Sequence, residues 1–457
     1  MIKLFLILCA WEKTYGGGFS DGGYCVKQTS DLGYIITGYT YSFGNGYGDL
    51  YLLKTDSLGN LEWSKTFGGD LEDVGFCVEN TGDGYVVVGS TYSYGVSEDL
   101  YFIKVDLSGN LIWQKIYGDA NYAQCGYEIE KTVDGGYIIT GYWSKYIYLL
   151  KTDVYGNMEW EKRYSVYGEN RGYSVEETSD NGYIIAGYTH SPAYLITDIC
   201  VIKTNSVGEI KWLRLFGGEG KEIGYCVEET HDKCYVIVGY TNSYGSGGYD
   251  IYFIKVDTLG NLLWEKTYGG GMNEFGYSVK ETYDKGFIIA GVKELGNAGY
   301  KNIYVLKTDS LGNVLWEKTF GGQFDDYGYW IENVSEKGYV ITGYTNSYGS
   351  GEYDVYLIKE ETGIKEKGNF KDFSFLTISN MFKDKIILKT GFTSEKNVFI
   401  VLYNLAGIPV FKSFYFFKAP VTIISDKKIE NLPQGIYFLS IYFDKGNFKR
   451  IKMIKTY

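Results

Sequence analysis

Histidine is almost absent from this sequence, and several catalytic motifs are absent with it. The 457 residues include only His190 and His231, so a Ser-His-Asp triad or a zinc site built from several histidines has almost no support. The seven cysteines form no C-x-x-C pair, and no G-x-x-x-x-G-K-S/T loop for nucleotide phosphates is present. No apolar run reaches the length of about 18 residues that a membrane-spanning helix needs. These absences argue against a multi-histidine zinc site, a Ser-His-Asp triad and a phosphate-binding nucleotide loop.

Positive charge is also scarce, but only in the first part of the chain. Residues 370–457 carry 14 Lys and Arg against 6 Asp and Glu, whereas the remaining residues carry 30 against 50. An acidic surface argues against nucleic acid as a partner, because binding a polyanion depends on Lys and Arg. None of the nine Trp lies in 370–457. The composition therefore predicts two domains, separated by a linker at 361–369.

Proline, with 4 residues, is far outnumbered by 61 Gly and 48 Tyr. Tyrosine favours strands and glycine permits tight turns, so this mixture predicts an all-β chain. Cys25, Cys77 and Cys226 occupy one equivalent place in "GYCV" or "GFCV" and are interpreted as small buried apolar residues.

A unit of about fifty residues is repeated seven times along the chain. Its clearest marker is a Trp that recurs at Trp11, Trp63, Trp113, Trp160, Trp212, Trp264 and Trp316. Each unit reads as four short strands joined by tight hairpin turns such as D-x-x-G-N, and the third strand, as in "IYFIKVD", is apolar on both faces. Such a strand must lie between other sheets, as in a propeller blade.

The phase of the repeat predicts how the ring closes. The chain starts with a lone "WEKTYGG" arm at 11–17 and ends the pattern with "DVYLIKE" at 354–360, which lacks its own Trp strand. We therefore expect a seven-bladed β-propeller over 11–360, closed by the N-terminal strand within the last blade. This part of the chain resembles bacterial seven-bladed β-propellers with repeats of about fifty residues. Residues 1–10, a Lys followed by an apolar run, resemble a short or truncated signal peptide.

The longer loops of the predicted blades all emerge on one face. They include "TNSYGSGGYD" at 241–250 and its near copy at 345–354, while the third unit carries an additional Trp in "YWSKY". Aromatic rings with a polar tip suit sugar faces, so the candidate ligand-binding residues are Trp143, Tyr244, Tyr249, Tyr348 and Tyr353. Packing within the blades is the alternative role for these rings.

A polar residue precedes the first strand of every unit. The set is Asp21, Asp73, Gln124, Asn170, Glu222, Glu274 and Asp326. One interpretation is a turn residue that bonds its own backbone. The other is cation binding, with calcium held by the five carboxylates Asp21, Asp73, Glu222, Glu274 and Asp326 near the channel mouth.

The C-terminal part carries the stretches "DKIIL" (384–388), "VFIVLYNLAGIPV" (398–410), "IENLPQGIYFLSI" (429–441) and "KRIKMIK" (449–455). With these stretches, residues 370–457 resemble the C-terminal sorting domain of cargo of the type IX secretion system; "ISNMF" (378–382) replaces the Pro-Asn-Pro box that usually opens this domain. The alternation of apolar and polar residues predicts a small β-sandwich. The resemblance implies the type IX machinery as a partner, and secretion to the medium or to the outer surface of a Gram-negative bacterium.

Together these patterns predict a secreted or cell-surface propeller that binds a surface glycan or protein, or serves as a scaffold. The alternative is a polysaccharide hydrolase or lyase that uses carboxylates on the long-loop face. No residue is assigned a catalytic role, because acids occupy nearly every equivalent position and no pair stands out.

Overall fold

The computed structural model describes residues 10–191, 196–296, 299–335 and 338–361. Between residues 377 and 455 it describes eight strands and the turn at 431–434. The chain divides into two compact units, one of which is Cys9–Thr362 and the other of which contains Gly363–Tyr457.

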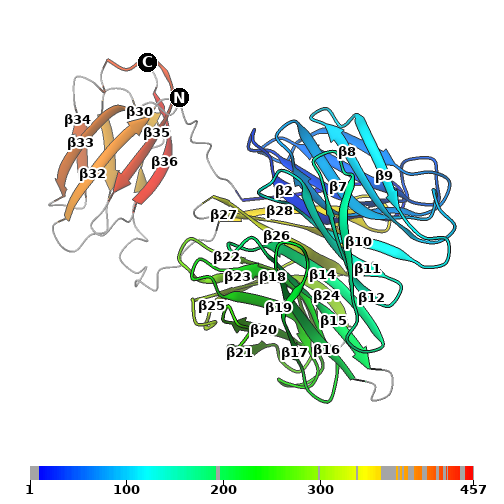
Figure 1. Ribbon diagram of the computed structural model, residues 1–457. Coiled ribbons are helices and arrows are strands. Elements are labelled where there is room, and N and C mark those ends of the chain that lie inside the picture. The colour runs from blue at the N-terminus through cyan, green and yellow to red at the C-terminus, as the bar shows by residue number, and fades with distance from the viewer. Residues whose placement is uncertain are drawn as a thin grey trace. The chain divides into compact units, whose positions relative to one another are not determined.

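Cys9–Thr362 is a seven-bladed β-propeller in which every blade is a four-stranded antiparallel sheet (Figure 1). Blade 1 contains β2 (Asp21–Gln28), β3 (Tyr34–Thr40), β4 (Asp49–Thr55) and β5 (Leu61–Phe67). Blade 2 contains β6 (Asp73–Asn80), β7 (Gly84–Thr91), β8 (Asp99–Asp106) and β9 (Leu111–Tyr117). Blade 3 contains β10 (Gln124–Lys131), β11 (Tyr137–Trp143), β12 (Tyr146–Thr152) and β13 (Met158–Tyr164). Blade 4 contains β14 (Glu169–Glu177), β15 (Tyr183–Ser191), β16 (Ile196–Thr204) and β17 (Ile210–Phe216). Blade 5 contains β18 (Glu222–Glu229), β19 (Tyr235–Thr241), β20 (Asp250–Val256) and β21 (Leu262–Tyr268). Blade 6 contains β22 (Glu274–Glu281), β23 (Phe287–Leu295), β24 (Tyr300–Thr308) and β25 (Val314–Phe320). Blade 7 is β26 (Asp326–Ser335), β27 (Gly338–Thr345), β28 (Asp354–Glu361) and β1 (Trp11–Tyr15).

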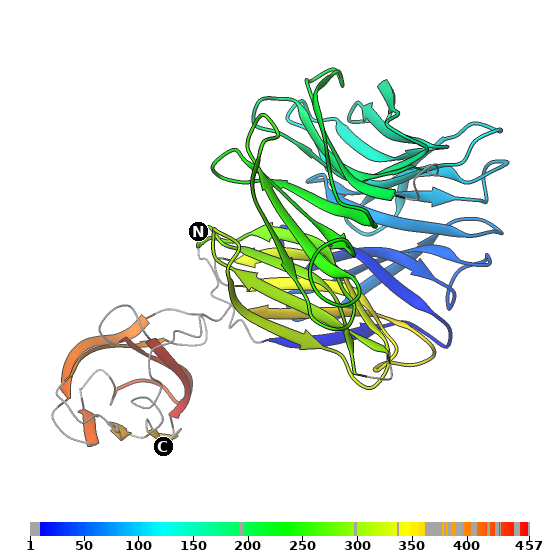
Figure 2. The same ribbon diagram turned by 90° about the horizontal axis from the view of Figure 1, so that it is seen from below.

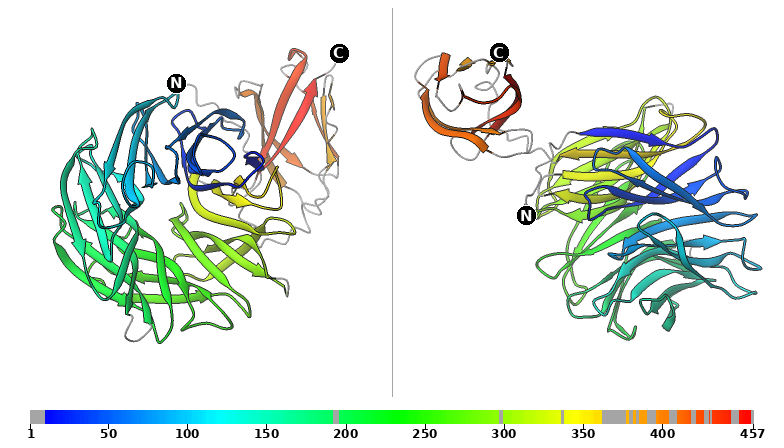
Figure 3. Two further views of the ribbon diagram at one scale, coloured as in Figure 1. Left: turned by 90° about the vertical axis from the view of Figure 1, so that its right-hand side faces the viewer. Right: turned by 90° about the horizontal axis from the view of Figure 1, so that it is seen from above.

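The N-terminal strand closes the ring, as the phase of the repeat predicted. β1 pairs with β28 over its whole length, from Trp11 opposite Lys359 to Tyr15 opposite Val355. Blade 1 therefore lies beside blade 7, and the blades follow one another around a common axis (Figure 2, Figure 3). Without β1, the outer edge of β28 would have no partner strand, and the pairing of β1 covers this edge.

The repeated D-x-x-G-N turn joins the third and fourth strands of a blade and contacts the preceding blade, which explains why it recurs. In blade 1 the Asp56 carboxylate accepts hydrogen bonds from the backbone N–H of Leu58 and Asn60, and Gly59 takes a φ of 73°. A Cβ on Gly59 would lie 2.7 Å from the ring of Trp11, which belongs to the preceding blade. The same approach of Trp to Gly recurs at the next five turns, so a Trp and a turn Gly meet at six of the seven blade junctions.

The third strands form the core of the blades, and the first strands line the channel. β4 and β20 are buried along their whole length, as expected for a strand packed on both faces. The first strands contact one another around the ring. The repeated Lys of the third strand is also buried: Lys54, for example, is 2% exposed and pairs with Asp31 at 2.8 Å.

The other compact unit contains two sheets. One has three strands, β29 (Thr377–Ile378), β31 (Lys385–Lys389) and β34 (Val421–Ser425); the other has five, β30 (Met381–Phe382), β36 (Phe448–Lys455), β35 (Gly435–Tyr442), β32 (Lys396–Tyr403) and β33 (Pro409–Phe417). In the described part of the chain, no helix is long and apolar enough to cross a membrane. The expected segment 1–10 and linker 361–369 lie almost entirely outside the described residues, so these boundaries stay predictions.

Candidate functional site

The central channel contains a closed ring of seven aromatic side chains, one from each first strand. Neighbouring ring centroids lie 4.8–5.3 Å apart. The members of this aromatic ring are Tyr24, Phe76, Tyr127, Tyr173, Tyr225, Tyr277 and Tyr329. Each follows the Gly of the G-Y or G-F motif, where the pairing register of the first strand shifts. A bulge re-aims a side chain, and here it aims seven of them at the axis.

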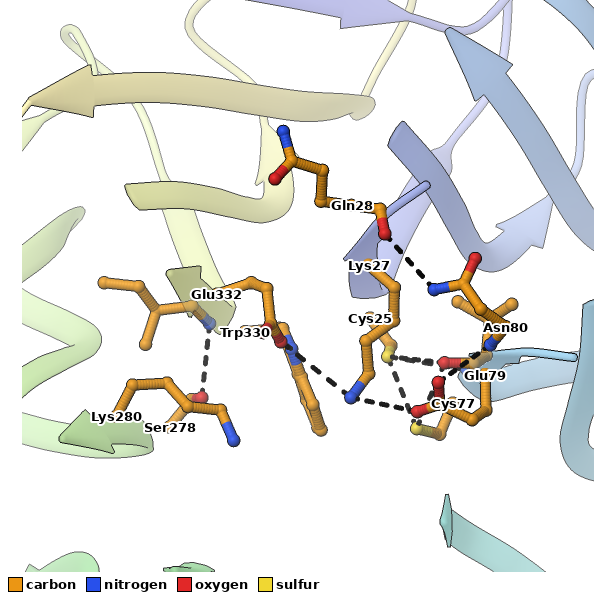
Figure 4. Close-up of polar contacts among 12 residues, drawn as sticks. Cys25, Lys27, Gln28, Cys77, Glu79, Asn80, Ser278, Lys280, Trp330 and Glu332 are labelled. Atoms are coloured by element: carbon orange, nitrogen blue, oxygen red, sulfur yellow. Dashed lines mark hydrogen bonds and ion pairs between the residues drawn. The ribbon is translucent and has the colours of Figure 1, made fainter. Parts of the chain in front are cut away.

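Charged side chains form a second level of the channel, three residues further along the first strands (Figure 4). Lys27 lies 3.1 Å from a carboxylate oxygen of Glu79 and 3.8 Å from one of Glu332, and it lies over the ring of Trp330. Burial alone would lower the pKa of Lys27, but Glu79 and Glu332 raise it well above its usual value. The Sγ atoms of Cys25 and Cys77 lie 3.3 Å apart beside this pair and are buried, as the sequence suggested. In these contacts the channel side chains bind one another, so their role is to stabilise the packing of the first strands.

The seven polar residues that were expected just before the first strands are the first or second residues of those strands, and most of them bond to the adjoining long loops. Asp21 is fully buried and accepts hydrogen bonds from the Gly17 N–H and the Ser42 hydroxyl, each at 2.7 Å, and from Thr40. Gly17 precedes the first strand and Ser42 follows the second, so one carboxylate joins two loops. We call such contacts loop latches.

Loop latches recur around the ring with local variations. Asp73, Glu222, Glu274 and Asp326 are at most 1% exposed, and each accepts a backbone N–H from the Gly four residues before it. Gln124 and Asn170 instead donate to backbone carbonyls. Among the described residues, no group of three or more His, Cys, Asp or Glu side chains is placed to hold a metal ion. These contacts to nearby backbone and hydroxyl groups agree with a role in stabilising the turns, and the calcium and carboxylate-catalysis interpretations stay predictions.

The predicted tyrosines lie in the long loops but do not converge on one site. Tyr244 and Tyr348 are 40% and 47% exposed, and each hydroxyl donates to a backbone carbonyl, of Gly217 and Gly321. Tyr249 packs against Tyr240, and Tyr353 packs against Tyr344. The two pairs of residues belong to blades 5 and 7, which blade 6 separates.

Trp143 ends β11 and is half-buried. The guanidinium of Arg163 lies over its ring, 2.9 Å from the centroid, and Tyr122 packs edge-on against it at 5.4 Å. The indole face therefore already has a stacking partner within the chain.

Two adjoining cavities lie on the long-loop face, between blades 3 and 4 and between blades 4 and 5. Their volumes are about 300 and about 530 Å³, and Glu169 lines both of them. We call them together the blade 3–5 groove. Its larger part is lined by four tyrosines, Tyr173, Tyr188, Tyr225 and Tyr240. Two of them, Tyr173 and Tyr225, belong to the aromatic ring. The groove therefore opens beside the mouth of the channel.

Arg171 and His190 are the groove residues that depart most clearly from the repeat. The Arg171 guanidinium lies 3.7 Å from the centroid of Tyr142, and its Nε donates to the Tyr188 hydroxyl at 3.1 Å, yet its buried Nη1 has no hydrogen-bond partner. His190 Nδ1 lies 2.9 Å from the Thr197 hydroxyl. Contacts within the chain thus fix both side chains, and both line the groove. The additional Trp of the third unit pointed to this side of the ring, but the sequence pattern did not single out Arg171 or His190.

Comparison with known proteins gives distant structural matches only. No family model and no curated protein matches the chain. It is similar to PorZ, an essential surface component of the type-IX secretion system of Porphyromonas gingivalis, with 10% identity, TM-score 0.44, and coverage of 97% of this chain and 60% of that one.

Two further solved structures are similar over about three quarters of the chain. A protein of unknown function from Dyadobacter fermentans matches with 10% identity, TM-score 0.46, and coverage of 77% of this chain and 99% of that one. The polysaccharide lyase Uly1 matches with 10% identity, TM-score 0.47, and coverage of 76% and 91%. At these values none of the three assigns a function to this chain.

Proposed function

We propose that the propeller binds a saccharide in the blade 3–5 groove and that the C-terminal unit directs the chain to the cell surface or the medium. The observation that carries the binding proposal is the pair of adjoining cavities with a tyrosine lining. A concave site with aromatic walls and a few placed polar groups is typical of small-ligand recognition. Tyrosine suits sugars because it offers an apolar face and a hydroxyl together.

Hydrogen-bonding groups in the groove complement this tyrosine surface. Arg171 has an unused Nη1 donor, and Glu169 lies where the two cavities meet. His190 is held through Nδ1 by Thr197, which leaves its other ring nitrogen for a ligand. Because these groups lie on one side of the ring only, the groove is a single site on a pseudo-symmetric scaffold.

The export part of the proposal rests on the stretches between 384 and 455 that resemble type IX sorting domains. The described strands β32 and β35 contain parts of two of these stretches and pair with each other. A sorting role for residues 370–457 would place the groove outside the cell, where polysaccharides are accessible.

A glycan array probed with the full-length chain, followed by calorimetric titration of each hit, tests the binding proposal. Arg171→Ala and His190→Ala should each weaken saccharide binding by about tenfold or more, because each removes a hydrogen-bonding side chain from the groove. His231→Ala is the matched control. His231 lies in the turn after β18, where it is exposed and pairs with Glu281, the last residue of β22. Binding to no glycan, or equal affinities for Arg171→Ala and His231→Ala, would favour the scaffold role.

A further inference from the structure

Blade 6 differs from its neighbours at the start of its third strand. In blades 1, 5 and 7 this position is an Asp whose carboxylate accepts backbone N–H groups of the preceding loop: Asp49 from Asn45 at 3.1 Å, Asp250 from Ser246 at 2.8 Å and Asp354 from Ser350 at 2.5 Å. In blade 6 the equivalent residue is Asn302, which lies opposite Lys293 as Asp250 lies opposite Thr241.

In blade 6 the loop between the second and third strands is replaced by a longer hairpin, so Asn302 has no such loop to bond. β23 and β24 continue their pairing beyond Asn302 as far as Leu295 opposite Tyr300. Asn302 is 8% exposed, and its Oδ1 is buried with no hydrogen-bond partner, whereas the equivalent Asp residues bond to their loops. A buried amide oxygen without a partner is costly, so a ligand that donates a hydrogen bond to it gains accordingly.

Asn302 lines a cavity of about 420 Å³ between blades 6 and 7. Three apolar side chains at this cavity remain well exposed: Leu295 at 37%, Tyr300 at 44% and Phe324 at 49%. The rings of Tyr300 and Phe324 meet edge to face, with centroids 6.0 Å apart and an interplanar angle of 87°. Together they form two walls of an open apolar pocket with an amide inside it.

None of the described residues that line this pocket is charged; Gln323 supplies a second carboxamide and Gly322 completes the set. A carboxamide both donates and accepts hydrogen bonds, as a sugar hydroxyl does. Exposed aromatic rings match the C–H face of a sugar ring. The chemistry of the pocket therefore selects a neutral ligand that combines an apolar face with hydroxyl groups.

We propose that the pocket formed by Tyr300, Asn302 and Phe324 is a second binding site, which takes one neutral sugar residue of an oligosaccharide. A sugar ring packs against Phe324 and Tyr300, and one of its hydroxyls donates to Asn302 Oδ1. This site is independent of the blade 3–5 groove, because the two share no residue.

Saturation-transfer NMR and calorimetric titration of the full-length chain with short neutral gluco-, manno-, galacto- and xylo-oligosaccharides test this site. The chain should bind at least one series, and Phe324→Ala and Asn302→Ala should each weaken that binding by about tenfold. Phe43→Ala is the matched control, because Phe43 is 44% exposed in a long loop of blade 1 and should leave the affinity unchanged.

Two results would overturn the proposal. One is the absence of binding to all four series by the full-length chain. The other is binding that Phe324→Ala and Asn302→Ala weaken no more than Phe43→Ala does. Since Phe324 is half-exposed, its variant should fold normally, and Tyr300→Ala provides a third test of the same wall. An Arg171→Ala variant should retain this binding, which separates failure of the pocket from failure of the groove.

Discussion

At the scale of single residues, the most informative side chains are buried polar groups with a defined partner. The Asp326 carboxylate, fully buried, accepts the Gly322 N–H and the Ser347 hydroxyl, each at 2.8 Å, as well as the hydroxyl of Thr345. One side chain thereby fixes both loops that frame this part of the binding face. Asp21, Asp73 and Glu222 likewise contact both of their loops, so these latches help to set the shape of the loops.

Asp326→Ala should destabilise the propeller by roughly 1–3 kcal/mol, because it leaves buried donors without an acceptor. Chemical unfolding of the variant and of the parent chain measures this difference. Amide exchange should also speed up at Gly322, whose N–H loses its partner. Equal stability and unchanged exchange would show that the latch contributes nothing.

Channel carboxylates predict an unusual dependence of stability on pH. Burial raises the pKa of Glu130 from 4.5 to about 8, and it also raises the pKa of Glu128, Glu176 and Glu228. Since the folded pKa of Glu130 lies above the unfolded value, the folded state binds more protons between these values. Its contribution to stability is therefore fully present below about pH 4.5 and is lost as the pH rises through about 8.

We expect the melting temperature to rise when the pH is lowered from 8 to 5, and Glu130→Gln should flatten this rise because the amide cannot ionise. Differential scanning calorimetry across this range measures both effects. A melting temperature that increases with pH, or an identical slope in the Gln variant, would contradict this account.

At the scale of elements, the pairing of β1 with β28 decides whether the ring is closed. Tyr356 in β28 donates a hydrogen bond to Glu12 in β1, and Tyr15 in β1 donates to the carbonyl of Gly59 at 2.6 Å. β1 thus connects blade 7 with blade 1 through both its sheet and its side chains.

Deleting residues 11–17 should lower the melting temperature by several degrees and expose β28 as an unpaired edge that promotes self-association. Calorimetry and size-exclusion chromatography report the two effects. A synthetic peptide of residues 10–18 in excess should restore part of the lost stability, because it binds only the folded chain. An unchanged melt after the deletion would refute the stabilising role of β1.

The elements show how far the sequence could lead. The seven Trp and the D-x-x-G-N turns predicted the blades, their number and the closing strand, because both motifs recur once in almost every unit at the same spacing. The aromatic ring escaped prediction, since the register shift that turns Tyr24 and its equivalents to the axis depends on strand pairing. Arg171 and Asn302 also escaped, because their importance lies in atoms that the fold leaves without a partner. Tyr244 and Tyr348 were attractive by composition, yet the fold engages their hydroxyls.

At the scale of the whole molecule, the chain consists of two compact units, which predicts separable behaviour. A chain that ends at 369 should keep the melting transition of the propeller, but it should lose surface exposure in a host with a type IX system. Calorimetry and cell fractionation of both chains check this. Equal surface signal from both would refute the sorting role, and a shifted propeller transition would show that the units depend on each other.

The antiparallel register of β1 and β28 also has a mechanical consequence. Because Trp11 lies opposite Lys359, the chain enters the propeller and leaves it at the same end of this strand pair. A pulling force between the two chain ends would open the pair like a zipper, one hydrogen-bonded couple at a time, and this is the weakest loading direction for a β-ladder. We therefore expect tension between residues 10 and 361 to detach β1 first and to open the ring at blade 7.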